Sequence, residues 1–105
     1  MSILGQVDLV AGVETALYAP APGDQADIQV IFVNRNPDKT ARVRVVHRPG
    51  AGPTVDENYL VFEKGVPPND ERVTFTFDVK NPEEVRVQSD SALVSATANG
   101  IERSI

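Results

Sequence analysis

The residues Arg72-Val73-Thr74-Phe75-Thr76-Phe77-Asp78-Val79 alternate strictly between polar and apolar side chains. Neighbouring side chains of an extended strand point to opposite faces, so this run predicts a β-strand with one face in a core and one in water. A second run at residues 84–89 repeats the alternation, and the link between the two contains Pro82, which has no amide hydrogen for a β-ladder. With a third run at residues 93–100, the last third of the chain predicts a compact antiparallel β domain.

The earlier part of the chain adds further short strands separated by turn residues. They are expected at residues 3–10, 14–19, 26–34, 41–48 and 59–63. About eight strands with no helical pattern longer than a turn predict an all-β fold, an antiparallel two-sheet sandwich of jelly-roll-like form. Jelly rolls and immunoglobulin-like sandwiches share this local pattern, although the absence of Cys and Trp argues against a true immunoglobulin domain. The order of the strands stays open.

The apolar positions of these strands predict the core of the sandwich. Its expected members are Val30, Phe32, Val43, Val45, Leu60, Phe62, Val73, Phe75, Phe77, Val85, Val87, Val94 and Ala96. Residues 30–33 are apolar on both faces of their strand, which is typical of a strand that is covered on both sides. We therefore expect this strand in the middle of a sheet or at an interface between molecules.

The composition limits the classes of protein to which the chain could belong. Its 105 residues fit one domain, residues 1–105, in which residues 1–6 could form an N-terminal arm. The sequence has no cysteine for disulfides or thiolate metal sites. The net charge of −5 opposes nucleic-acid binding, which needs clustered Lys and Arg. No secretion signal or long apolar run is visible, so we expect no membrane partner and synthesis in a cytoplasm.

No residue pattern indicates catalysis or a bound cofactor. His47 is the only histidine, and no nucleophile or orienting carboxylate accompanies it in a local motif, so we interpret it as a structural or rim residue. Nucleophile elbows, phosphate-binding loops, dinucleotide fingerprints and zinc spacings are all missing. The sequence therefore predicts a protein that is not an enzyme and that carries no cofactor.

Acidic segments and tyrosines are two further kinds of candidate ligand site. The segments 56–58 and 69–71 are acidic but lack the spacing of a calcium loop, and Asn and Asp often serve turns by bonding to their own backbone. Tyr18 and Tyr59 could each stack on a sugar, but the chain has no Trp and shows no paired aromatics at loop tips. We interpret both tyrosines as half-buried core residues.

Some apolar and basic residues remain unexplained once one core is filled. Ile31 and Val33, with Val61 and Leu93, would be covered most simply by another copy of the chain or by another protein. A basic stripe on one strand carries Arg42, Arg44 and Arg48. The stripe could dock an acidic surface, or it could pair with Asp27 or Glu63 on neighbouring strands. Both alternatives stay open.

Turn and strand residues also carry a resemblance that spans nearly the whole chain. The segments concerned are residues 4–6, 14–18, 56–62, 68–70, 85–89 and 95–102. Together they resemble a family of small β-sandwich virion structural proteins of tailed bacteriophages. The resemblance implies a non-enzymatic component of a virus particle, placed either on the capsid shell or in the tail and its fibres.

The expectation that follows is a capsid decoration or cement protein that binds and stabilises the assembled head shell. Its partners would be the major capsid protein or other virion proteins, and it would act as a homo-oligomer such as a trimer. The expected attachment residues are Ile3, Leu4, Ile31, Val33, Arg42, Arg44 and Arg48. The alternative is a tail-tip or fibre-associated module that binds a host receptor through the loops at residues 49–58 and 66–71.

Overall fold

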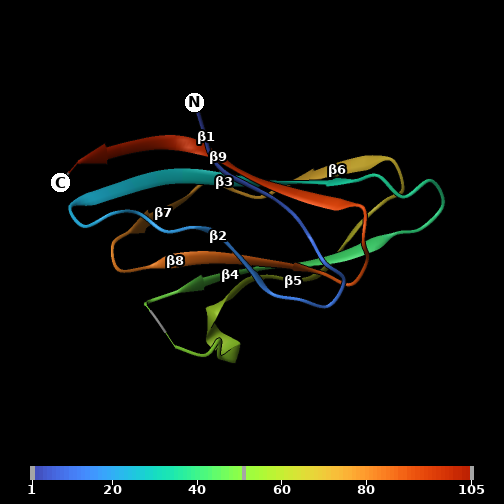
Figure 1. Ribbon diagram of the computed structural model, residues 1–105, viewed down its shortest axis with the longest axis horizontal. Helices are drawn as coiled ribbons and strands as arrows, with labels where there is room; N and C mark the ends of the chain where they lie inside the picture. The colour runs from blue at the N-terminus through green and yellow to red at the C-terminus, as the bar shows by residue number, and fades with distance from the viewer. Residues whose placement is uncertain (1, 51, 105) are drawn as a thin grey trace.

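The computed structural model describes residues 2–50 and 52–104. Within them, nine strands and one short 3₁₀ turn form two antiparallel sheets packed face to face (Figure 1). The elements are β1 (Ser2–Asp8), β2 (Thr15–Tyr18), β3 (Asp24–Asn34), β4 (Ala41–Arg48), η1 (Asp56–Asn58), β5 (Tyr59–Val66), β6 (Asp70–Val73), β7 (Phe77–Lys80), β8 (Glu84–Ser89) and β9 (Val94–Ser104). The predicted all-β, two-sheet sandwich is confirmed.

The strand order is that of a jelly roll. One sheet, called here the β3 sheet, runs β1-β9-β3 and is completed by β6 and β7, which both pair with the same edge of β3. The other, called the β4 sheet, runs β2-β8-β4-β5. If β6 and β7 are counted as one interrupted strand, the chain crosses between the sheets at every connection except the β4–β5 hairpin. Two sheets of four positions connected in this way form a jelly roll.

The longest ladder joins β3 to β9 and sets the centre of the sandwich. Their pairing is continuous from Asp24↔Ser104 to Asn34↔Val94. Alternate residues of both strands are buried because they face the other sheet, and they form the core with apolar residues of β4 and β8. The most deeply buried apolar side chains are Ile28, Val30, Phe32, Val43, Val45, Val66, Val79, Val85, Val87 and Val94.

The predicted strand at residues 72–79 is interrupted, which corrects part of the predicted core. Val73 pairs with Ile31 of β3, whereas Phe77 pairs with Ile28. Between these two pairs, the β6–β7 segment therefore contains one more residue than β3. An extra residue reverses which face the following side chains occupy. Val73 therefore lies on the outer face and Val79 in the core, and Phe75 is 59% exposed. Thr74 bridges the interruption, because its amide donates to Val30 O and its Oγ1 accepts from Val30 N.

A second bulge corrects the predicted burial of Phe62. Between the pairs Val43↔Lys64 and Val45↔Val61, β5 has one more residue than β4. The extra length is accommodated at Glu63, whose φ of 56° lies in the left-handed region. Phe62 is consequently 54% exposed, and Leu60 only packs against the edge of the core.

Residues 2–6 lie in a strand of the sandwich and not in a separate arm. From Ser2 onward the chain is strand β1, paired with β9, and Met1 lies outside the described residues. A register shift between Ile3 and Gly5 leaves Ile3 on the outer face while Leu4 packs against the core. Gly5 is required here because a Cβ atom would collide with the carbonyl oxygen of Leu17 on β2.

Candidate functional site

The outer face of the β3 sheet gathers three of the predicted attachment residues, Ile3, Ile31 and Val33. In Figure 1 no described element lies beyond this sheet on its outer side. The strand registers arrange its side chains in rows, one of Gln6, Thr97, Ile31 and Val73, and the next of Asp8, Ser95, Val33 and Glu71. Ile3 is 61% exposed on β1 and Val73 is 49% exposed on β6, so aliphatic groups reach the surface at both sides of the sheet.

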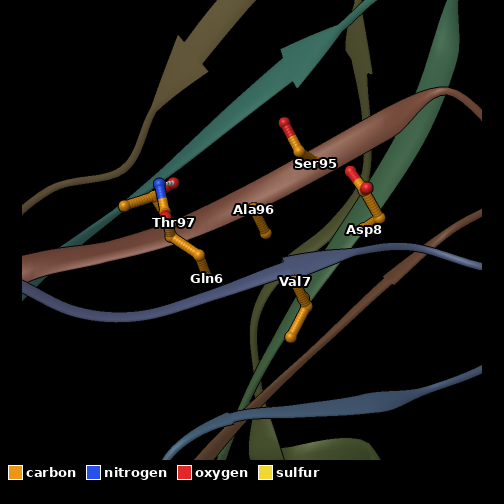
Figure 2. Close-up of a pocket in the computed structure, with 6 residues that line it drawn as sticks. All are labelled: Gln6, Val7, Asp8, Ser95, Ala96 and Thr97. Carbon is orange, nitrogen blue, oxygen red and sulfur yellow. Dashed lines mark hydrogen bonds between the residues drawn. The ribbon is translucent and has the colours of Figure 1, made fainter.

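A shallow polar hollow of about 280 Å³ lies on this face between β1 and β9 (Figure 2). Gln6, Asp8, Ser95 and Thr97 contribute its polar side chains, while Val7 points away from them toward the core. Gln6 Nε2 donates to Thr97 Oγ1 at 3.2 Å. Asp8 pairs with Arg35 at 2.9 Å, but both side chains are about half exposed or more. The hollow can exchange hydrogen bonds with a surface laid against it.

The other predicted attachment residues lie elsewhere. Leu4 is turned toward the core, and the basic stripe of Arg42, Arg44 and Arg48 lies on the outer face of the β4 sheet, on the opposite side of the sandwich. The predicted residues therefore do not form one continuous surface, and only Ile3, Ile31 and Val33 share a face.

The basic stripe is engaged in contacts within the molecule. Arg44 Nη2 lies 2.9 Å from Glu63 Oε1, and this hydrogen bond raises the pKa of Arg44 and lowers the pKa of Glu63. Arg42 Nη1 donates to the Glu63 carbonyl at 3.3 Å. Of the two acidic residues named as alternative partners, Glu63 thus contacts the stripe, whereas Asp27 pairs with Arg103 at 2.8 Å.

Arg48 is held beneath the long loop that connects β4 to β5. Its guanidinium pairs with Glu84 of β8 and donates to the carbonyl of Gly52 in the loop. Thr54 Oγ1 reaches across the sheet to Glu14 Oε1 at 2.7 Å, before β2 begins. The loop therefore covers part of the outer face of the β4 sheet, and Val46 is only 1% exposed although it lies outside the central core cluster.

An aromatic hollow lies beside this loop. Its lining residues are Asp56, Tyr59 and Phe62, and its volume is about 360 Å³. The two rings pack edge to face with centroids 4.9 Å apart. The Arg44 guanidinium lies over the Phe62 ring, 4.5 Å from its centroid, and 5.7 Å from the Tyr59 centroid. Two aromatic rings, a carboxylate and a guanidinium are thus collected on the surface.

The sequence reasoning missed this aromatic pair because it placed Phe62 in the core. A signal was present, since Val61 and Phe62 are adjacent and both apolar. Neighbouring residues of a regular strand cannot both face one core. One of the two had to lie outside, and the bulge at Glu63 places Phe62 there.

His47 links β4 to the turn between β7 and β8. Its Nε2 lies 3.0 Å from Glu83 Oε1, and its ring centroid is 5.6 Å from that of Phe77. Burial acts to raise the pKa of Glu83, but hydrogen bonds from the Lys80 amide and from His47 outweigh burial and lower it. The contacts of His47 tie the turn to the sheet.

The described residues form neither a metal site nor a membrane-spanning helix. Among residues 2–50 and 52–104, no group of three or more His, Cys, Asp or Glu side chains is arranged to hold a metal ion. The part of the chain that the structure describes also contains no helix long and apolar enough to cross a membrane. Comparisons with protein-family models, curated proteins and solved structures found no match to this chain.

Proposed function

We propose that this protein is a non-enzymatic structural component of a virus particle, a capsid decoration protein that docks through the outer face of its β3 sheet. The observation that carries the proposal is the set of aliphatic side chains on that uncovered face: Ile3, Ile31, Val33 and Val73. Exposed apolar residues that share one face favour contact with another protein. The resemblance of the sequence to phage virion proteins supplies the class of that partner.

The docking surface proposed here is narrower than the one expected from the sequence. Arg44 and Arg48 already pair with Glu63 and Glu84, so recruiting them would break contacts within the molecule. The β3 face needs no such rearrangement. Because its apolar contacts are not screened by ions, attachment should persist at high salt. The expected homo-oligomer stays a prediction, and the same face could serve it.

The test is to locate the protein in purified virus particles that carry a single substitution. Val33→Lys introduces a charge on the β3 face, and Val55→Lys is the matched control, because Val55 is 46% exposed in the loop over the other sheet. Electron microscopy should show regular copies on the head with the wild-type chain and with Val55→Lys, and few with Val33→Lys. Density only at the tail, absence from the particle, or full occupancy with Val33→Lys would each contradict the proposal.

The alternative function, a tail-tip or fibre-associated module for a host receptor, is favoured by one feature, the aromatic hollow beside the loop of residues 49–58. If it holds, the purified protein should bind host cells, and Phe62→Ala should abolish binding while Val33→Lys leaves it unchanged. Host-cell binding that survives Phe62→Ala, or no binding by the wild-type chain, would contradict this alternative.

A further inference from the structure

We propose that the hollow formed by Tyr59, Phe62 and Asp56 is a binding site for a neutral saccharide. The aromatic pair supplies the platform. Phe62 is 54% exposed and the edge-to-face contact with Tyr59, 4.9 Å between centroids, holds both rings in fixed orientations. A rigid, exposed aromatic surface offers apolar contact to the C–H face of a sugar ring at little cost in side-chain entropy.

A fixed hydrogen-bond donor lies beside the platform. Arg44 is anchored by Glu63 at 2.9 Å and lies over the Phe62 ring at 4.5 Å. A guanidinium carries five N–H donors, and the bond to Glu63 Oε1 uses Nη2. Anchoring of the side chain means that a ligand does not have to order it. Arg44 can therefore donate to a sugar hydroxyl without a change of rotamer.

A hydrogen-bond acceptor also lines the hollow. The carboxylate of Asp56 belongs to η1 and makes no hydrogen bond or ion pair with another residue of the described ranges 2–50 and 52–104. A carboxylate accepts hydrogen bonds at both oxygens. The aromatic platform, the Arg44 donor and the Asp56 acceptor together match a ligand that has an apolar ring face and hydroxyl groups around its edge.

The charges around the hollow favour a neutral ligand over an ionic one. A cationic ligand stacked on Phe62 would lie close to the Arg44 guanidinium, which is 4.5 Å from the centroid of that ring. An anionic ligand would meet the carboxylate of Asp56, which lines the hollow. Like charges at such short range repel, whereas a sugar hydroxyl can both donate and accept. The proposal does not rest on the proposed virion function.

The test is a titration of the full chain, labelled with nitrogen-15, with four neutral trisaccharides: maltotriose, cellotriose, mannotriose and triacetylchitotriose. Amide shifts from at least one sugar should map to residues 56–63. Phe62→Ala should weaken binding at least about tenfold, which corresponds to roughly 1.4 kcal/mol. Phe75→Ala is the matched control, since Phe75 is a similarly exposed phenylalanine on the β6–β7 side of the other sheet, and it should leave the affinity unchanged.

A second variant separates a saccharide site from a cation site. Asp56→Asn keeps the size and a hydrogen-bonding group but removes the charge, so sugar binding should change by less than about fivefold, or roughly 1 kcal/mol. N-acetyl-lysine methylamide serves as the cationic probe. The proposal is overturned if none of the four sugars shifts residues 56–63, if the shifts persist in Phe62→Ala, or if the lysine probe binds more tightly than every sugar.

Discussion

At the scale of single residues, Tyr18 joins the two sheets of the sandwich. It lies in β2 of the β4 sheet, and its hydroxyl donates to Glu102 Oε2 of β9 at 2.5 Å. Burial, and then the hydrogen bond and the charge of Glu102, raise the pKa of Tyr18 well above its usual range. The protonated phenol is therefore the form that the folded state favours.

This pKa shift predicts a dependence of stability on alkaline pH. Below about pH 10 both states keep the phenol protonated, so its contribution is complete there. Above that pH the unfolded chain releases the proton first, and stability falls as the pH rises toward the folded-state pKa. Tyr18→Phe should lose about 1 kcal/mol at neutral pH, and its stability should then fall less steeply than that of the wild type between about pH 9 and pH 11. Urea unfolding followed by circular dichroism measures the free energy of unfolding at each pH. Equal slopes of that free energy against pH for Tyr18→Phe and the wild type would contradict the prediction.

Asn34 shows what the sequence does not reveal at this scale. It ends β3 fully buried, and its Nδ2 donates to the carbonyls of Lys39 and Val66 at 2.8 and 2.9 Å. Its Oδ1 accepts from the Asn36 amide at 3.0 Å. An Asn before Arg35-Asn36-Pro37 looks like an ordinary turn residue, because its partners on β5 are distant in the sequence. The β3–β4 turn depends on it to reach the other sheet.

At the scale of elements, the interruption between β6 and β7 gives two valines of one sequence run opposite environments. Val79 is fully buried, whereas Val73 is 49% exposed. Val79→Ala should therefore cost about 2 kcal/mol of unfolding free energy, while Val73→Ala should stay within about 0.5 kcal/mol of the wild type. Urea unfolding of the two variants measures the difference. Similar losses for both would mean that residues 72–79 form one regular strand.

The same element shows how far alternation predicts a fold. The alternation of apolar and polar residues predicted the position of almost every strand, because a half-buried strand requires a side-chain period of two. The faces of Val73, Phe75 and Phe62 did not follow, because one extra residue in a strand reverses all later side chains without leaving a gap in the pattern. The position of a bulge depends on the partner strand, and a single sequence does not identify that strand.

The sequence predicted the candidate surfaces only where alternation along a strand shows which side chains point away from the core. Of the four residues expected to be left over from the core, Ile31 and Val33 lie on the outer face of β3 and Leu93 is 49% exposed, whereas Val61 packs against the core. The basic stripe was also read correctly as one face of β4, but its partner among the acidic residues could be chosen only once β5 was known to lie beside it. The aromatic hollow depended on the bulge at Glu63 and was missed.

At the scale of the whole molecule, the two sheets share one core. The radius of gyration of 13.2 Å matches the value of about 13 Å expected for a single domain of this length. Residues of both sheets contribute to that core, so neither sheet can bury its inner face alone. The molecule should therefore unfold as one unit.

Cooperative unfolding can be checked with two probes. Tyrosine fluorescence reports on Tyr18 and Tyr59, and far-ultraviolet circular dichroism reports on the strands of both sheets. The two signals should give coincident urea transitions with one midpoint. An earlier fluorescence transition would show that the region around β2 or β5 opens before the rest, and the variant Tyr59→Phe would identify which tyrosine reports it.

The opposed positions of the β3 face and the aromatic hollow have a consequence for arrays of this protein. The two surfaces belong to opposite sheets of the sandwich, which lie one above the other in Figure 1. A copy fixed by its β3 face turns its hollow outward, so both surfaces can be occupied at once. A lattice of fixed copies would then display hollows at regular intervals, and ligands repeated along a polymer could be held by avidity even where each contact is weak.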